Sequence, residues 1–360
     1  MEIITTLPNR YSSFNEEALR IEEFGSVKIH RVELPGHNSG MLDQSKAFLA
    51  YAQSAMKLTK KGEYDLVYAT SSRLMTAALG ALISVLRGGV LYLDIRDIFV
   101  DTMKDVLPKK LIWLLKPLFS FIERLTIRRA VNVNVVSAGF LPYFYERYPD
   151  KKYTVFTNGI DEEFMPCVNT TVEPSPLVAE GGVVQVVYAG NMGEGQGLHT
   201  IIPSLALTLG NNIKFTLIGD GGRRGGLVAE LDKNGVENVV IRNPVKREEL
   251  IEIYQAADVL FLHLNDYDAF RKVLPSKLFE YAALGKPILA GVKGYSADFI
   301  REHINNAAVF PPCDAGAAVR AFSELEIETK VRGEFVEKFS RKEIMNEMAE
   351  NIFSTIDSQQ

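Results

Sequence analysis

Cysteine is scarce in this sequence, which holds only Cys167 and Cys313 among its 360 residues. These two residues form neither a disulfide framework nor the paired spacing of a zinc site, as is typical of a chain in a reducing compartment. The sequence also lacks an uninterrupted apolar run of about 18 residues, which a transmembrane helix needs. Its first ten residues, MEIITTLPNR, show no basic segment followed by an apolar one, so we expect no signal peptide. These absences favour a cytoplasmic protein.

An excess of positive charge is also missing. The chain has 40 Lys and Arg residues against 45 Asp and Glu, a net charge of −5, so we expect no nucleic-acid partner. The content of 47% hydrophobic and 24% charged residues is that of a globular protein. Because hydrophobic cores stop growing at about 250 residues, the length indicates two domains.

Short β-branched runs alternate with longer helical ones along the chain, which predicts parallel sheets covered by helices. Strands are predicted at residues 1–7, 27–34, 64–70, 89–95, 132–138, 153–159, 183–190, 213–221, 238–245, 258–264 and 287–292. Helices are predicted near residues 43–61, 73–87, 110–130, 138–147, 197–209, 223–234, 247–257, 275–284 and 295–304. The fold class is therefore α/β, with two Rossmann-like domains.

The segment 166–182 contains three prolines, one serine, two threonines and a glycine pair without periodicity, which is linker composition. We therefore predict an N-terminal domain at residues 1–165 and a second domain at 183–339. The last segment, 340–360, shows the apolar stripe of a helix, which we expect to pack across to the N-terminal domain.

Two glycine-rich turns follow predicted strands of the second domain. The first contains Gly190, Gly193, Gly195 and Gly197 before a helix, an arrangement that lets backbone N–H groups approach an anion. The second, GDGGRRGG, begins at Gly219. It departs from the dinucleotide fingerprint because Arg224 occupies the third glycine position, and it lacks the Gly-Lys-Ser/Thr ending of a phosphate-binding loop. A nicotinamide dehydrogenase and a nucleoside triphosphatase are therefore disfavoured, whereas Arg223 and Arg224 suit phosphate oxygens.

A third segment, DYDAFRKVLPSKLFEYAALGKPILAG, covers residues 266–291. Pro275 suits the first turn of a helix, and Lys277 and Glu280 share one face of that helix. A lysine at a helix start suits a diphosphate, and a carboxylate one turn later suits a pair of sugar hydroxyls. A solvated Lys–Glu pair is the plainer interpretation of the same spacing.

The order of these motifs resembles the donor domain of retaining GT-B glycosyltransferases of family 4. The resemblance rests on YAGN with its glycine-rich turn, IGDG, AADV and PSKLFEY followed by GKPI. The subgroup it is most similar to builds bacterial surface polysaccharides such as O-antigen. NGID (Asn158 to Asp161) and LPNRY (Leu7 to Tyr11) are weaker matches in the first half. The implied fold has two Rossmann-like domains facing across a cleft.

The resemblance also implies roles for individual residues. Glu280 matches a glutamate that binds the ribose of a sugar nucleotide, and Lys277 and Arg224 match basic positions at the diphosphate. Gly193 matches the backbone turn near the β-phosphate. The nucleotide-binding set implied in this way is Gly190, Asn191, Gly193, Arg224, Lys277, Leu278 and Glu280.

Three positions depart from the family pattern. Lys272 stands where the family has its first glutamate, and Asn191 and Gln196 replace basic residues around the first turn. Arg96, followed by Asp97, stands where the family often has a histidine. We expect Arg96 and Asp97 to act with Lys277 and Arg224 in catalysis, since Asp97 comes just after a predicted strand. A local ion network with Asp94 is the competing interpretation, and in that case the acceptor site is expected around Asn9, Arg10 and Tyr11.

Charge stabilisation at the departing diphosphate is the chemistry that these residues can supply. The resemblance implies that the departing phosphate itself helps to deprotonate the acceptor, so no pair of catalytic carboxylates is required. Asp266 and Asp268 form an Asp-x-Asp pattern, but this pattern is common by chance and we expect no metal and no further cofactor.

The segment 104–130 is rich in basic residues interleaved with Leu, Ile, Phe and the single tryptophan, Trp113. This pattern is typical of a helix at a membrane interface, although part of the apolar face must cover the domain core. We therefore expect peripheral association with the inner face of the bacterial inner membrane.

Together these features predict a retaining glycosyltransferase that moves a sugar, an N-acetylhexosamine from a UDP-sugar, onto an undecaprenyl-diphosphate-linked saccharide in O-antigen or lipopolysaccharide synthesis. Two alternatives stay open. One is a GT-B-type UDP-sugar 2-epimerase, which needs no acceptor and no basic apolar patch. The other is a non-catalytic sugar-nucleotide-binding protein. This alternative stays open because Lys272 stands where the family has a glutamate.

Overall fold

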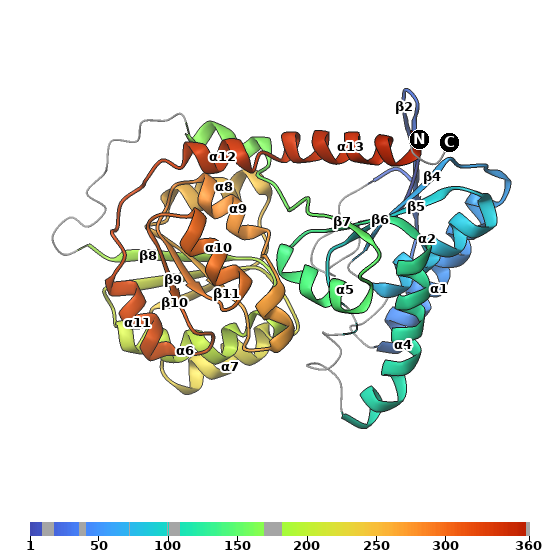
Figure 1. Cartoon of the computed structure of the whole chain (residues 1–360). Coiled ribbons are helices and arrows are strands. Elements are labelled where there is room, and N and C mark those ends of the chain that lie inside the picture. The colour runs from blue at the N-terminus through green and yellow to red at the C-terminus, as the bar shows by residue number, and fades with distance from the viewer. Residues whose placement is uncertain are drawn as a thin grey trace.

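The computed structural model describes residues 1–8, 18–35, 41–71, 73–98, 100, 109–168 and 182–357. It consists of two halves, each built on parallel β-sheet and helices (Figure 1). The first half ends near residue 159, and the second half contains the described residues from 182 to about 338. The predicted linker at 166–182 lies mostly outside the described residues.

The second half is a doubly wound sheet of six parallel strands in the order β10-β9-β8-β11-β12-β13. Helices α8, α9, α10 and α12 pack on one face, and α6, α7 and α11 pack on the other. The strands are β8 (Val184–Ala189), β9 (Ile213–Ile218), β10 (Val239–Arg242), β11 (Val259–His263), β12 (Ile288–Gly291) and β13 (Ala307–Phe310). The helices are α6 (Leu198–Leu209), α7 (Arg224–Lys233), α8 (Arg247–Ala256), α9 (Lys277–Ala283), α10 (Tyr295–His303), α11 (Ala315–Ser323) and α12 (Gly333–Lys338).

The first half contains two sheets. Four parallel strands form the order β4-β5-β6-β7, and β1-β3-β2 form a separate sheet in which β2 is antiparallel. The strands are β1 (Glu2–Thr6), β2 (Ile21–Phe24), β3 (Val27–Val32), β4 (Leu66–Ser71), β5 (Val90–Ile95), β6 (Ala130–Val135) and β7 (Lys152–Thr154). The helices are α1 (Met41–Leu58), α2 (Leu74–Arg87), α4 (Lys109–Arg129) and α5 (Leu141–Arg147). Strand β2 was not predicted; it pairs with β3 through a tight turn at Gly25, whose φ is 56°.

The chain passes between the halves twice, and the two passages are paired. The backbone N–H of Ile160 donates to Phe339, and that of Arg341 donates to Ile160. After the first passage, Ile160 and Phe164 are buried in the core of the second half, so the predicted boundary at residue 165 runs through a segment that packs there. Phe164 belongs to the 3-10 helix η3 (Glu162–Val168).

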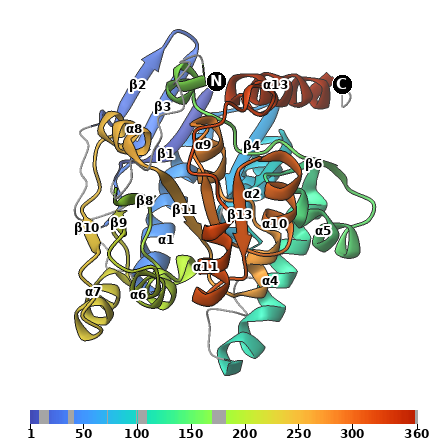
Figure 2. The ribbon, with the colours of Figure 1, turned by 90° about the vertical axis from the view of Figure 1, so that its left-hand side faces the viewer.

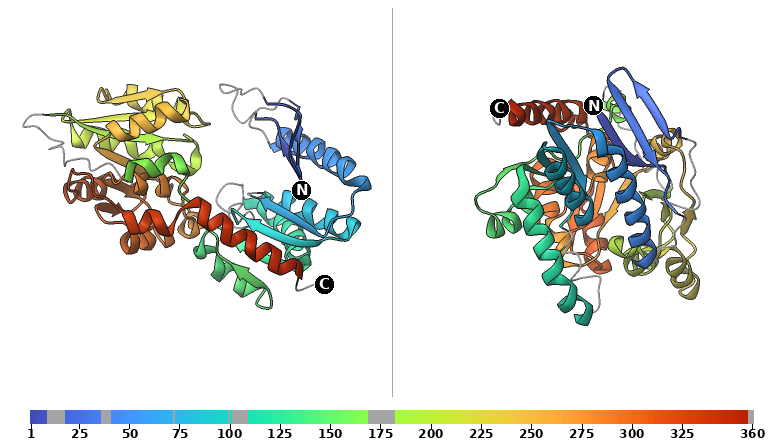
Figure 3. Two further views of the ribbon diagram at one scale, coloured as in Figure 1. Left: turned by 90° about the horizontal axis from the view of Figure 1, so that it is seen from above. Right: turned by 90° about the vertical axis from the view of Figure 1, so that its right-hand side faces the viewer.

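The last helix, α13 (Arg341–Asp357), extends from the second half along the first, as the left panel of Figure 3 shows. Oδ1 of Asn351 accepts hydrogen bonds from the Tyr92 hydroxyl at 2.9 Å and from Nδ2 of Asn132 at 3.3 Å. Because both partners lie on strands of the first half, α13 joins the two halves. None of the described helices has the length and hydropathy that crossing a membrane requires.

A buried arginine fixes the far end of α9. The Arg332 side chain donates to the carbonyl oxygens of Ala282 at 3.2 Å, Lys286 at 3.0 Å and Asn305 at 2.7 Å. Arg332 is only 5% exposed, and burial lowers the pKa of its guanidinium to about 10. These bonds tie the end of α9 to the start of β12 and to the loop before β13.

We expect Arg332→Met to destabilise the protein by about 3 kcal/mol or more, because a side chain of similar length leaves several buried carbonyl groups without donors. Urea unfolding followed by circular dichroism measures the effect. Arg301→Met is the matched control: Arg301 is exposed on α10 and pairs with Asp298, which is also exposed, so its replacement should change stability by less than about 0.5 kcal/mol. Equal effects in the two variants would contradict this account of Arg332.

Candidate functional site

The candidate site lies where the central strands of the second half end; Figure 2 shows the sheet of this half from the opposite side. Gly190 follows β8 and Gly219 follows β9, and their φ angles of 146° and 144° favour glycine. A Cβ on Gly219 would lie 1.9 Å from the Gly190 carbonyl oxygen, and a Cβ on Gly190 would lie 2.1 Å from Nζ of Lys277. The two turns and the first residue of α9 therefore lie so close together that any side chain at Gly190 or Gly219 would clash.

Lys277 lies against the first glycine-rich turn. Its Nζ is 5.5 Å from the centroid of the Tyr188 ring, which is within cation–π distance. The Tyr188 hydroxyl in turn donates to the carbonyl of Asn191 at 2.6 Å. The structure thus places an ammonium group beside closely approachable backbone, the combination that suits a diphosphate.

Asn191 and Gln196, which replace basic residues of the family, shape this turn. Nδ2 of Asn191 donates to Oε1 of Gln196 at 2.9 Å, and the Gly193 N–H donates to the same oxygen at 3.3 Å. Asn191 also contacts the second turn, since a Cβ on Gly221 would lie 2.5 Å from Asn191 Oδ1. These amides hold the turn in place without adding charge.

The two arginines of the second turn have different partners. Arg224, the first residue of α7, donates from Nη2 to Oδ1 of Asn243 at 3.1 Å, so its guanidinium lies toward the end of β10. Arg223 pairs with Glu194 of the first turn, and Glu194 also accepts a hydrogen bond from the Tyr267 hydroxyl at 2.7 Å. Arg223, which was predicted to suit phosphate oxygens, therefore ties the two turns together through Glu194.

Glu280 lies one turn along α9 from Lys277. Its side chain is 19% exposed, and Nη1 of Arg247 lies 3.9 Å from its Oε1. Burial raises the pKa of the Glu280 carboxyl, whereas the positive charges of Arg247 and Lys277 lower it. The Leu278 side chain, in contrast, is fully buried in the core, and its N–H donates to Pro275.

The aspartates of the Asp-x-Asp pattern are paired with cations. Asp266 pairs with Lys293, and Asp268 pairs with Arg271 at 3.1 Å. Within the described part of the chain, no group of three or more His, Cys, Asp or Glu side chains could hold a metal ion.

In the first half, Arg96 takes part in the local ion network with Asp94 that was the competing interpretation of the sequence. Asp94 is fully buried and accepts hydrogen bonds from Arg96 at 3.0 Å and from Asn134 at 2.7 Å. Arg96 also donates to Oδ1 of Asn158, in the NGID motif, at 3.0 Å. Arg96 is thus anchored, but about a third of its side chain stays exposed at the end of β5.

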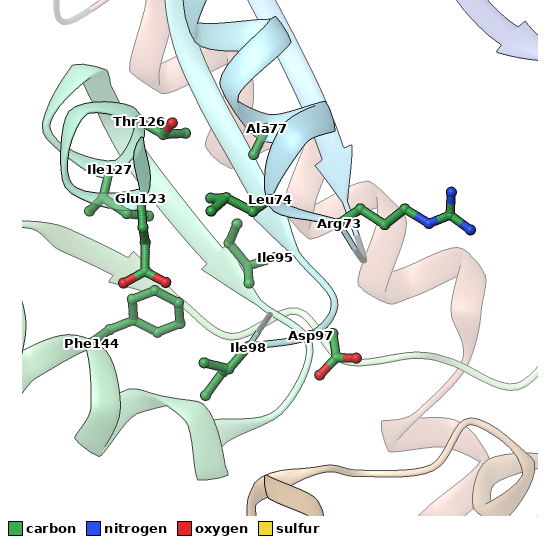
Figure 4. Close-up of a pocket in the computed structure, with 10 residues that line it drawn as sticks. All are labelled: Arg73, Leu74, Ala77, Ile95, Asp97, Ile98, Glu123, Thr126, Ile127 and Phe144. Atoms are coloured by element: carbon green, nitrogen blue, oxygen red, sulfur yellow. The ribbon is translucent and has the colours of Figure 1, made fainter. Parts of the chain in front are cut away.

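Asp97 borders a pocket between α2, α4 and α5 (Figure 4). Most of the lining is apolar, but the buried carboxylate of Glu123 lies there beside Phe144, and it accepts hydrogen bonds from the hydroxyls of Tyr143 and Tyr148 at 2.9 Å each. The alternative acceptor residues, Asn9, Arg10 and Tyr11, lie outside the described residues.

Lys272 lies where the halves meet. The Ser137 hydroxyl of the first half donates to the Lys272 carbonyl at 2.5 Å, and Nζ of Lys272 is 5.7 Å from the Tyr143 ring. The position that departs most clearly from the family pattern therefore contacts the first half.

Sequence reasoning missed the histidine beneath the first turn. His263, which we assigned only to a strand, is buried; its ring accepts the Cys313 N–H at Nε2, 3.0 Å away, and donates from Nδ1 to the Gln196 carbonyl at 2.7 Å. The neutral ring makes both bonds. Burial lowers the pKa of His263 to about 4. Glu194 and Arg247 were missed too; Glu194 lies within the first glycine-rich turn, whereas no motif marks Arg247.

Comparison with known proteins bears on this site directly. Residues 172–342, which include both glycine-rich turns and α9, match the family described as "Glycosyl transferases group 1". The protein is a glycosyltransferase with the GT-B fold. No curated protein sequence matches the chain.

Solved glycosyltransferase-fold structures extend this likeness to the first half. Sucrose-phosphate synthase from Thermosynechococcus elongatus superposes with a TM-score of 0.71 at 14% identity, covering 98% of this glycosyltransferase and 89% of that chain. HepE from Anabaena, in complex with UDP-glucose, has a TM-score of 0.65 at 16% identity, with 91% and 86% covered. WaaG, a glycosyltransferase involved in lipopolysaccharide biosynthesis, has a TM-score of 0.60 at 15% identity, with 89% and 83% covered. At these identities the likeness shows the fold.

We expect the stability of this glycosyltransferase to fall as the pH drops from about 6.5 toward 4, in part because of His263. The unfolded chain binds a proton at the usual histidine pKa near 6.5, whereas the folded chain binds it only near 4. The contribution of His263 to the free energy of unfolding is fully present above pH 6.5. It is lost as the pH falls toward 4, and the loss is about 3 kcal/mol. In His263→Gln the unfolding free energy, measured in urea from about pH 7.5 to 4.5, should fall less steeply. Parallel pH profiles of variant and wild type would contradict this.

Proposed function

We propose that this glycosyltransferase is a retaining enzyme of family 4 that transfers an N-acetylhexosamine from its UDP-sugar. The observation that carries the proposal is the meeting of Lys277 with the backbone of Gly190 and Gly219, one helical turn from the partly buried carboxylate of Glu280. A diphosphate fits beside Lys277, and a ribose fits at Glu280. The complex of HepE with UDP-glucose supports the choice of nucleotide.

Catalysis in this proposal comes from stabilising charge on the leaving group. A departing nucleoside diphosphate gains negative charge, and an ammonium group with oriented N–H groups lowers the energy of that charge most where water is excluded. Lys277 supplies the ammonium group beside the turn at Gly190. The departing phosphate then accepts the acceptor's proton on the same face of the sugar, which accounts for retention of configuration.

The acceptor binds to the first half, at the end of β5, where ligands of open α/β sheets bind. Arg96 is fixed there by Asp94 and Asn158 and keeps an exposed edge, which suits a phosphate of the acceptor. Asp97 lies next to it. The acceptor in this proposal is an undecaprenyl-diphosphate-linked saccharide of O-antigen or a related surface polysaccharide, and the role of WaaG in lipopolysaccharide biosynthesis supports that class.

We expect Glu280→Ala and Lys277→Ala each to weaken UDP binding at least about tenfold, because each removes a charged contact from a partly desolvated site. Isothermal titration calorimetry with UDP measures this. Glu252→Ala changes an exposed glutamate on α8 and should bind UDP like the wild type. If Glu280→Ala also kept wild-type affinity, Glu280 would have no part in the site.

The same proposal places the enzyme on the inner membrane through α4. Trp113 is 81% exposed, Phe121 58% and Leu125 53%, and the exposed residues Lys116 and Arg124 lie among them on α4. Helix α2 packs beside α4 and exposes Val85, Leu82 and Leu86. Apolar side chains with basic neighbours suit an anionic lipid surface. The predicted segment 104–130 begins outside the described residues, which resume at 109.

We expect the triple variant Trp113→Ser, Phe121→Ser, Leu125→Ser to bind anionic phospholipid vesicles at least about tenfold more weakly, since three apolar groups no longer enter the interface. Vesicle sedimentation measures the bound fraction. Phe353→Ser is the control, because Phe353 is a 67% exposed aromatic residue on α13. Equal sedimentation of the triple variant and the wild type would contradict the assignment of α4 to the membrane.

A further inference from the structure

Arg247 joins three carboxylates: two of them come from the crossing segment and the third comes from α9. It is the first residue of α8, and its guanidinium lies 5.0 Å from the centroid of the buried Phe164 ring. It pairs with Asp161 and Glu163 through Nη2 and Nε. Nη1 lies 3.9 Å from Oε1 of Glu280. The stacked ring and the two nearer carboxylates hold the guanidinium plane, so its remaining edge faces Glu280.

This cluster adjoins the place where the chain passes between the halves. Asp161 follows Ile160, whose backbone pairs with Phe339 and Arg341 of the return passage. Asp161 also pairs with the Arg341 side chain at the start of α13. One continuous set of ion pairs therefore runs from the crossing segment through Arg247 to Glu280.

Charge at Glu280 depends on this set. Burial raises the pKa of the Glu280 carboxyl; Arg247 is the strongest opposing influence, followed by Lys277 on the same helix. Asp161 raises this pKa and Arg341 lowers it. Tyr254 of α8 also lies within electrostatic range. Without Arg247, the Glu280 carboxyl would lose the nearest positive charge on α8 and keep the cost of burial.

We propose that Arg247 is a positioning residue for nucleotide binding, which orients the Glu280 carboxylate, keeps it ionised and ties it to the crossing segment at Asp161. This inference rests on the proposed role of Glu280 at the ribose. In this proposal Arg247 acts through Glu280. Lysine cannot replace it fully, because a single ammonium group lacks the fork that reaches three carboxylates at once.

The test is UDP binding by calorimetry as a function of pH. We expect Arg247→Gln to bind UDP about tenfold more weakly than the wild type at the acidic end of the pH series, with the deficit shrinking as the pH rises and Glu280 ionises in the variant too. Arg242→Gln is the matched control, because Arg242, at the end of β10, also pairs with a glutamate of α8: its partner is Glu249, at 2.8 Å. Its profile should follow the wild type and thereby report the titration of UDP itself.

A second comparison separates positioning from a merely structural effect. In a Glu280→Gln background, Arg247→Gln should cause no further loss of affinity, since its effect passes through the Glu280 carboxylate. Arg247→Lys, which keeps the charge, should retain the wild-type pH profile with an affinity between those of wild type and Arg247→Gln. If Arg247→Gln does not fold, Arg247→Lys carries the test.

The outcomes distinguish this inference from the proposed function. Failure of the wild type to bind UDP would overturn the proposed function and this inference with it. Wild-type binding with an Arg247→Gln deficit that is absent, or equal at every pH, would overturn the inference alone. Losses of UDP affinity that add fully when Arg247→Gln and Glu280→Gln are combined would also overturn the inference alone. An Arg247→Lys variant whose UDP affinity depends on pH differently from that of the wild type would overturn it too.

Discussion

The close approach of Gly190, Gly219 and Lys277 is the constraint on which the rest of this structure depends. No side chain fits on either glycine, since a Cβ would overlap a carbonyl oxygen in one case and an ammonium nitrogen in the other. The positive φ angles of both residues also require glycine, because other residues rarely adopt them. The ammonium group of Lys277 is thereby held at the ends of β8 and β9, where the proposed function puts the leaving group of the sugar transfer.

Helix α9 carries Lys277 and Glu280, and two arginines fix it from opposite directions. Arg332 binds the carbonyl of Ala282 near its end and joins it to the start of β12. Arg247 reaches Glu280 from α8 and is itself held by the segment that connects the halves. A seven-residue helix has little stability of its own, so these contacts and its buried face determine where its two charged residues lie.

The regular elements could be predicted from the sequence because their patterns are local. Helix α4 spans Lys109–Arg129, against a prediction of 110–130, and strands β8 to β12 of the second half lie within their predicted ranges. The edge strand β13 was not predicted. The contacts that complete the site could not be predicted, since Arg247 lies 86 residues from Asp161 and 33 from Glu280 in the sequence. The buried His263 looked like any strand residue, and the hairpin of β2 and β3 has no strong turn motif beyond Gly25. The sequence motifs identified the residues that suit a nucleotide. The side chains that hold those residues in place lie far from them in the sequence, and no motif links the two.

Thermal unfolding in the presence of nucleoside diphosphates tests the central claim most directly. A ligand at 100 times its dissociation constant adds about 2.7 kcal/mol to the stability of the state that binds it. The account predicts that UDP raises the unfolding temperature of the wild type, and that an equal concentration of inorganic pyrophosphate does so much less because it lacks the ribose that Glu280 holds. Unchanged unfolding temperatures with UDP, GDP and ADP alike would contradict a nucleotide site at Gly190, Lys277 and Glu280.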